Sequence, residues 1–160
     1  MSMIGMLTQL TAADLAAIAG APRQLPAVLD GAPTLCLDKL WNGLQFLLEA
    51  YAVRDASAPD LLDSAVLGGD PVGPDLGYGR AGVLPADDVR RIANALTAID
   101  GARLRDGFDP GAMADDDIYP TSIWAEGDSV LHELMTAFVD LVAFYQSAAA
   151  AGNAMATYLT

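Results

Sequence analysis

Apolar residues recur at helical spacing in three long segments of the chain. In residues 38–51, 86–99 and 129–150 they fall three or four positions apart, the spacing that places side chains on one face of an α-helix. The third segment has the longest apolar stripe: Leu131, Leu134, Met135, Phe138, Leu141, Val142, Tyr145 and Ala149. The pattern therefore predicts three amphipathic helices, of which the last is the main packing helix.

The two ends of the chain, residues 1–13 and 141–160, carry no charged side chain. Because burial of an unpaired charge is costly, uncharged ends indicate segments that lie inside the protein. Residues 3–10 are rich in strand-forming types, and residues 154–159 follow Gly152-Asn153, a pair typical of helix ends. We therefore predict that both terminal segments are strands of the same sheet.

The segments between these elements are predicted to be short. Thr11-Ala12-Ala13-Asp14 has the pattern of a capping box, so a short helix is expected to begin there. Residues 54–76 are predicted to be loop-like, with a short helix over 59–67, and residues 78–84 to form a strand weakened by glycine.

Together these elements predict one domain, residues 1–160, of the α+β class. A small mixed β-sheet that includes both chain termini is packed by several helices, the longest near 129–150.

The chain of 160 residues is strongly acidic, with 21 acidic and 8 basic side chains and a net charge of -13. An acidic surface disfavours nucleic acid and favours a protein partner with a basic surface. The uncharged stretch 141–160 is interrupted by Gln146, Ser147, Gly152 and Asn153. A spanning helix needs about 20 predominantly apolar residues, so no membrane segment is expected.

A single cysteine, Cys36, excludes an intramolecular disulfide, and the first residues lack the basic region of a signal peptide. Both features favour a cytoplasmic protein. With one Cys and one His the chain lacks the ligands of a structural zinc site. Neither a dinucleotide-binding nor a Walker glycine pattern occurs, so no cofactor and no metal are predicted, and no oligomeric state is assigned.

His132 is the only side chain whose ordinary pKa lies near neutrality. Helical spacing places it with Thr136 and Asp140, away from the apolar stripe. A general base held near Asp140 is one interpretation, but no nucleophile accompanies it, and a solvated histidine is favoured. No catalytic residue is therefore assigned, and the acidic run 115–117 is interpreted as a solvated turn.

A polar stripe follows the predicted helix 38–51: Asp38, Asn42, Gln45 and Glu49. It forms either an ordinary solvated face or the wall of a polar cleft beside Trp41, and both interpretations stay open. If a cleft exists, the candidate ligand-binding residues are Asp38, Lys39, Trp41, Gln45, Tyr78 and Tyr119.

Several short motifs occur in a characteristic order: Met3-Ile4-Gly5, Leu37-Asp38-Lys39 with Trp41, Ala65-Val66-Leu67-Gly68-Gly69, Gly77-Tyr78-Gly79, Phe108-Asp109-Pro110, Ile118-Tyr119-Pro120 and Phe144-Tyr145-Gln146. This combination covers almost the whole chain and resembles the YfbM-like family of small bacterial proteins, a domain of unknown function. The resemblance implies an α+β fold in a bacterial cytoplasm and supplies no activity. Relatives often carry His at the position of Gln45, so an activity that depended on that His would be absent here.

Two functions are compatible with these features. The first is a non-enzymatic protein-interaction or binding module, for example an immunity-like protein that neutralises a toxin. The alternative is a small-molecule-binding protein or enzyme that uses a cleft near Asp38, Trp41, Tyr78 and Tyr119. A wide apolar surface patch favours the first, and a cleft that gathers those residues favours the second.

Overall fold

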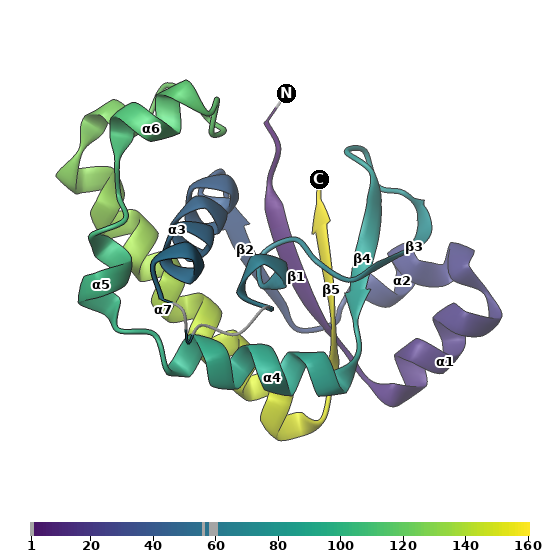
Figure 1. The fold of residues 1–160 in the computed structure, drawn as a ribbon. Coiled ribbons are helices and arrows are strands. Elements are labelled where there is room, and N and C mark those ends of the chain that lie inside the picture. Colours follow the sequence, from purple (N-terminus) through teal and green to yellow (C-terminus); the bar gives the residue numbers. More distant parts are fainter. Residues whose placement is uncertain (1, 56, 58–60) are drawn as a thin grey trace.

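The computed structural model describes residues 2–55, 57 and 61–160 (Figure 1). Its framework is a five-stranded sheet in the order β2-β1-β5-β4-β3, with the bounds β1 (Gly5–Leu10), β2 (Thr34–Asp38), β3 (Asp70–Asp75), β4 (Arg80–Leu84) and β5 (Ala154–Leu159). The predicted α+β class is confirmed. The sheet was expected to be mixed, but all four neighbouring pairs are antiparallel.

The two terminal strands lie in the same sheet, as predicted, and the structure places them next to each other in its middle. β1 and β5 pair along their whole length, from Gly5 opposite Leu159 to Leu10 opposite Ala154. The pairing continues beyond the strands, where the N–H groups of Ile4 and Thr160 each donate to the other's carbonyl oxygen at 2.9 and 3.0 Å. Because β5 also pairs with β4, it connects the two halves of the sheet.

One face of the sheet is covered by the long helices α3 (Trp41–Arg54), α4 (Ala86–Thr97) and α7 (Asp128–Ala151), with the shorter α5 (Gly101–Arg105) and α6 (Pro110–Asp115) at its side (Figure 1). We call it the covered face. Its core is large and includes Leu7, Leu44, Leu134, Phe138 and Met155. On α7, Tyr145 is fully buried, and its hydroxyl donates to the carbonyl oxygen of Ala65 at 2.8 Å. Burial raises the pKa of this phenol.

In the part of the chain that the structure describes, the helices packed on the other face are α1 (Ala12–Gly20), the 3-10 turn Pro22–Gln24 and α2 (Leu25–Leu29). The predicted capping box opens α1: the Thr11 hydroxyl accepts from the Asp14 N–H at 3.1 Å, and the Asp14 carboxylate accepts from the Thr11 N–H at 2.8 Å. The core beneath these helices is small: Leu10, Ile18, Leu25, Leu29, Ala81, Ala154, Ala156 and Tyr158. Five of its eight members come from the strands, and three of those are alanines, which explains why short helices suffice here.

The structure differs from the predicted elements in the middle of the chain. Strands β2 and β3 were not predicted, and helix α3 begins at Trp41 rather than at Asp38. Asp38 is instead the last residue of β2, with a φ of 49° that turns the chain toward α3. In the expected helix 59–67, residues 62–64 form a 3-10 turn, and residues 59 and 60 lie outside the described residues.

The segment that follows this turn packs directly on the sheet. Thr157 of β5 accepts a hydrogen bond from the Gly68 N–H at 2.9 Å and donates one to the Gly68 carbonyl oxygen at 2.8 Å. A Cβ added to Gly82 of β4 would collide with that carbonyl oxygen. Glycine at position 82 therefore permits the close approach of the chain to the strand.

Neither edge strand of the sheet is a regular, isolated strand. The edge strand β3 contains Pro71 and Pro74, and its register with β4 is interrupted after Val72. The other edge strand, β2, contacts α7. Length and composition alone would allow α7 to cross a membrane, but its apolar stripe is built into the core on the covered face, where Leu134, Leu141 and Tyr145 are fully buried.

Candidate functional site

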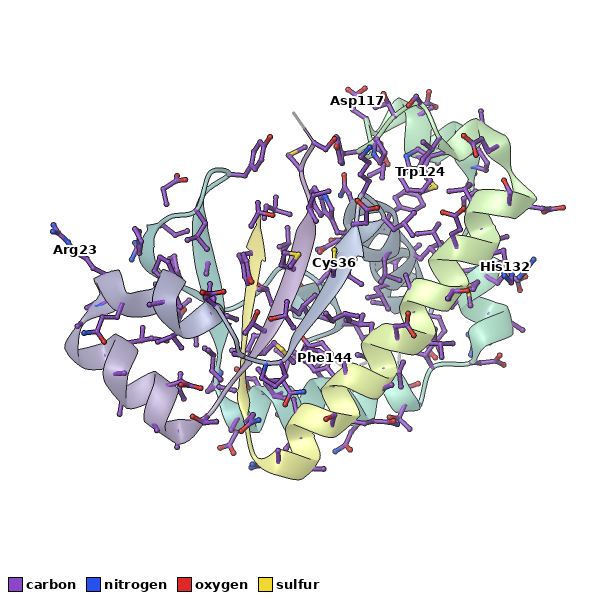
Figure 2. The ribbon with its side chains drawn as sticks, turned by 180° about the vertical axis from the view of Figure 1, so that it is seen from behind. Arg23, Cys36, Asp117, Trp124, His132 and Phe144 are labelled. Atoms are coloured by element: carbon purple, nitrogen blue, oxygen red, sulfur yellow. The ribbon has the colours of Figure 1, made fainter. Side chains whose placement is uncertain are left out.

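Among the described residues, no helix covers part of the second face of the sheet. Figure 2 views the molecule from this side, and the strands are visible between the α1–α2 pair and α7. A hollow of about 500 Å³ lies there beside α2, with Met6, Thr34 and Tyr158 among the residues that line it. Its floor is therefore formed by three neighbouring strands, β2, β1 and β5.

Hydrogen bonds between side chains tie this floor together. The Thr8 hydroxyl is fully buried and lies 2.8 Å from the Thr34 hydroxyl and 3.0 Å from the Tyr158 hydroxyl. The three groups bridge β2, β1 and β5. Because each hydroxyl has a partner, the floor is satisfied without an added ligand, and the half-buried Met6 side chain remains available for apolar contact.

A second hollow of about 270 Å³ lies between β2 and α7. Leu35, Leu37, Leu40 and Ala137 give it apolar walls, and the carboxylates of Asp38, Glu133 and Asp140 also line it. Among the described residues, neither hollow is lined by Lys or Arg. The two hollows thus combine apolar surface with uncompensated negative charge.

Both hollows are lined by residues of β2, although they share no lining residue. Thr34 lines the first and Cys36 the second, and side chains two residues apart on a strand lie on the same face of the sheet. Cys36 is an exposed free thiol, visible in Figure 2 on the open strands. We call this region the β2 surface and define it by Met6, Thr34, Cys36 and Tyr158 on the sheet with Asp30, Asp38, Glu133 and Asp140 around them.

Two of the candidate residues predicted from the sequence meet in the structure. The rings of Trp41 and Tyr119 stack with centroids 6.1 Å apart and an interplanar angle of 25°. The Trp41 Nε1–H donates to the Met3 carbonyl oxygen at 3.3 Å, and the Met3 N–H donates to the Tyr119 hydroxyl at 3.1 Å. The pair therefore holds the segment that leads into β1, and Trp41 is only 8 % exposed.

The polar stripe of α3 serves mainly to anchor neighbouring loops. The Asn42 side-chain oxygen accepts from the Tyr119 N–H at 2.8 Å. The Gln45 amide nitrogen donates to the Asp63 carbonyl oxygen at 3.0 Å and to the Glu49 carboxylate at 2.7 Å. The Gln45 side-chain oxygen is buried, and no donor from the described part of the chain reaches it.

The other candidates lie apart from one another. Asp38 lines the hollow beside α7, and Lys39 follows it as an exposed residue. Tyr78 lies in the turn between β3 and β4 and lines a third hollow. The structure thus brings Trp41 and Tyr119 together, whereas Asp38, Gln45 and Tyr78 face three different surroundings.

His132 projects outward from α7, as the helical spacing predicted (Figure 2). The run 115–117 is exposed at the end of α6. Within residues 2–55, 57 and 61–160, no three His, Cys, Asp or Glu side chains are grouped so that they could hold a metal ion.

Sequence reasoning did not identify Glu133 and Cys36 as parts of a surface, and it considered Asp140 only as a neighbour of His132. A signal existed for the acids, because positions 133 and 140 are seven residues apart and share one helix face. Nothing in the sequence indicated that these two acids lie close to β2, because β2 itself was not predicted.

A family model for a domain of unknown function, DUF1877, matches residues 1–158. The chain belongs to this family. The fold of this DUF1877 protein is similar to that in the crystal structure of YfbM from Escherichia coli, a protein of unknown function. The TM-score is 0.79 at 23 % sequence identity, over 98 % of this chain and 99 % of that one. No curated protein matches this chain.

Proposed function

We propose that this DUF1877 protein is a non-enzymatic interaction module that binds a protein partner through the β2 surface. The observation that carries the proposal is the pair of hollows beside β2: Asp30 lines the hollow on the open part of the sheet, and Asp38, Glu133 and Asp140 line the hollow between β2 and α7, each together with apolar residues. Apolar surface provides the contact area for association, and charged groups around it select the partner and its orientation.

The charge of the chain supports a basic partner over a second copy of itself. Each copy has a net charge of -13, and pairing two β2 surfaces would bring eight carboxylates of the same sign together. Like charges across an interface oppose association, whereas a positive patch on a partner would accelerate and orient it. An immunity-like role, in which the partner is a basic toxin, is one specific form of this function.

The alternative, a small-molecule cleft near Asp38, Trp41, Tyr78 and Tyr119, has less support. The Trp41 ring nitrogen already donates to the Met3 carbonyl oxygen, and the Tyr119 hydroxyl already accepts from the Met3 N–H, so both side chains hold the N-terminal segment. Asp38 and Tyr78 line separate hollows. A bacterial cytoplasm fits the exposed free thiol of Cys36, because thiols stay reduced in that compartment.

The test uses two charge-reversal variants with the same net charge. Glu133→Lys/Asp140→Lys alters the β2 surface, and the control Asp115→Lys/Asp116→Lys alters exposed carboxylates at the end of α6. A partner is first isolated with the tagged wild-type protein from extracts of the source bacterium, purified, and measured by titration calorimetry against all three proteins.

We expect the β2-surface variant to bind at least about tenfold more weakly, since loss of close charge pairs across an interface costs about 1.5 kcal/mol or more. The control variant should bind as the wild type does. Equal weakening by both variants would show that only total charge matters. No weakening by either would place the interface elsewhere, and each of these results contradicts the proposal.

A further inference from the structure

A hollow of about 230 Å³ lies where β4 begins, on the covered face of the sheet, and of the residues that define the β2 surface it includes Tyr158. Gly68, Gly69 and Gly82 contribute backbone to its walls, and Tyr78 and Arg80 contribute side chains. Gly82 must lack a Cβ so that the Gly68 carbonyl oxygen can approach it. The segment 67–69 thereby forms one wall of the hollow, and β4 forms the opposite wall.

Arg80 is the only charged side chain that lines this hollow among the described residues. Its Nε–H donates to the Gly73 carbonyl oxygen at 2.9 Å, which holds the guanidinium in place. The ion pairs of the described residues involve Arg90, Arg91 and Arg103, so Arg80 has no carboxylate partner there. Five of the eight basic side chains have no ion pair among the described residues, and Arg80 is the one of them that lines this hollow.

The nearest acid in the hairpin does not neutralise Arg80. Asp75 lies opposite Arg80 in the register of β3 and β4. Its carboxylate instead accepts from the N–H groups of Gly77 and Gly79, at 2.7 and 3.3 Å, and closes the turn between the strands. The guanidinium is therefore fixed at its Nε, while its two terminal nitrogens have no hydrogen-bond acceptor in the described part of the chain.

Tyr78 gives the hollow an aromatic surface. Its side chain is one of three large apolar side chains exposed in the described structure, at 38 %, and it lies two residues before Arg80. An aromatic ring provides apolar contact and stacks against a planar ligand group. A guanidinium presents parallel N–H donors that match the two oxygens of a carboxylate.

We propose that this hollow binds a small organic carboxylate, with its carboxylate on Arg80 and its apolar body against Tyr78. The single cation matches a monoanion, and the net charge of -13 disfavours a more highly charged ligand such as a phosphomonoester. A volume of about 230 Å³ suits a ligand about the size of a single ring, because pockets for larger ligands usually exceed about 300 Å³. Tyr158 lines both this hollow and the hollow beside α2, whereas Arg80 and Tyr78, which carry this proposal, are not part of the β2 surface.

Benzoate is the probe, and benzamide is its uncharged analogue of the same shape. Each is titrated into the full chain labelled with ¹⁵N, and amide shifts are followed by NMR. We expect saturable shifts with benzoate at Gly68, Gly69 and the first residues of β4, and binding of benzamide at least about tenfold weaker, because a hydrogen bond to a charged group contributes about 1.5–3 kcal/mol.

The variant Arg80→Gln should weaken benzoate binding at least about tenfold. Arg23→Gln is the matched control, because Arg23 points into solvent beside α1 (Figure 2) and should not affect binding. If Arg80→Gln alters the hairpin, seen as shifts throughout β3 and β4 before ligand is added, Arg80→Lys retains the charge and should bind with intermediate affinity.

Three results would overturn the proposal. One is the absence of saturable shifts in this hollow at millimolar benzoate. Another is equal affinity for benzamide and benzoate. The third is an unchanged benzoate affinity in both Arg80→Gln and Arg80→Lys.

Discussion

The two faces of the sheet are built from the same five strands but differ in almost every other respect. The covered face packs three long helices over a core that includes Trp124, Phe138 and Tyr145. The second face packs short helices over alanines, and part of it is left open. Successive residues of β5 illustrate the division, since Met155 belongs to the larger core and Ala154 and Ala156 to the smaller one. The comparison indicates that the covered face supplies most of the stability, which leaves the second face free to make contacts with other molecules.

Both faces depend on β5, so its removal is expected to have the largest effect. Deletion of residues 155–160 leaves β1 and β4 without their shared partner and exposes both cores. We expect no cooperative unfolding transition when the truncated protein is heated and followed by circular dichroism. Deletion of Thr160 alone is the control and should keep the transition. A cooperative transition after the longer deletion would show that β5 is dispensable.

A large side chain removed from the covered face should be costly. Phe138 of α7 is 6 % exposed, and Phe138→Ala should lower the free energy of unfolding by about 3–5 kcal/mol, because a buried cavity is left. The neighbouring Val139 is 62 % exposed, so Val139→Ala should change the free energy of unfolding by less than about 0.5 kcal/mol. Urea unfolding measures both values. A loss below about 1 kcal/mol for Phe138→Ala would contradict the assignment of the core.

Two tyrosines permit a matched test of the faces. Tyr145→Phe leaves the buried Ala65 carbonyl oxygen without the 2.8 Å hydrogen bond it accepts, and should cost about 1–3 kcal/mol. Tyr158→Phe removes a 3.0 Å contact with the Thr8 hydroxyl, which keeps Thr34 as a partner, and should cost about 0.5–1.5 kcal/mol. Urea unfolding of both variants gives the comparison. A larger loss for Tyr158→Phe would reverse the proposed roles of the two faces.

Alkaline pH should reduce the difference in the free energy of unfolding between the wild type and Tyr145→Phe. Burial raises the pKa of Tyr145 above its ordinary value of 10.0, so its stabilising contribution is complete below pH 10.0 and is lost as pH rises further. Each pH unit above that value should lower the free energy of unfolding of the wild type, relative to Tyr145→Phe, by about 1.4 kcal/mol. Unfolding in urea at neutral pH and one unit above 10.0 measures the change. An unchanged difference would show that the phenol can ionise in the folded protein.

The sequence predicts those parts of the fold that depend on local patterns. The helix periodicity, the capping box at Thr11 and the uncharged terminal strands all correspond to observed elements. β3 was missed because Pro71, Gly73 and Pro74 are typical of a loop, and its pairing with β4 is set by the rest of the sheet. β2 is short, and its assignment depends on contact with β1, which lies far from it in the sequence.

The candidate site was less predictable than the fold, because its residues meet only through the sheet. Trp41 and Tyr119 do lie together, but their role at Met3 depends on the position of the N-terminal segment. Asp38 was assigned to a helix face, whereas it ends β2 at a φ of 49°. That single difference moves its carboxylate from the stripe of α3 to the hollow shared with Glu133 and Asp140.

The prolines of β3 and the contact between α7 and β2 also affect how this protein behaves in concentrated solution. Strands at sheet edges template the growth of aggregates through their unpaired backbone groups, and prolines or covering helices prevent such growth. Two prolines interrupt β3, and α7 packs against β2, so both edges are less able to pair with another molecule while the protein is folded. We therefore expect the rate of aggregation at high concentration to depend on the unfolding rate and to change little with how often the molecules collide.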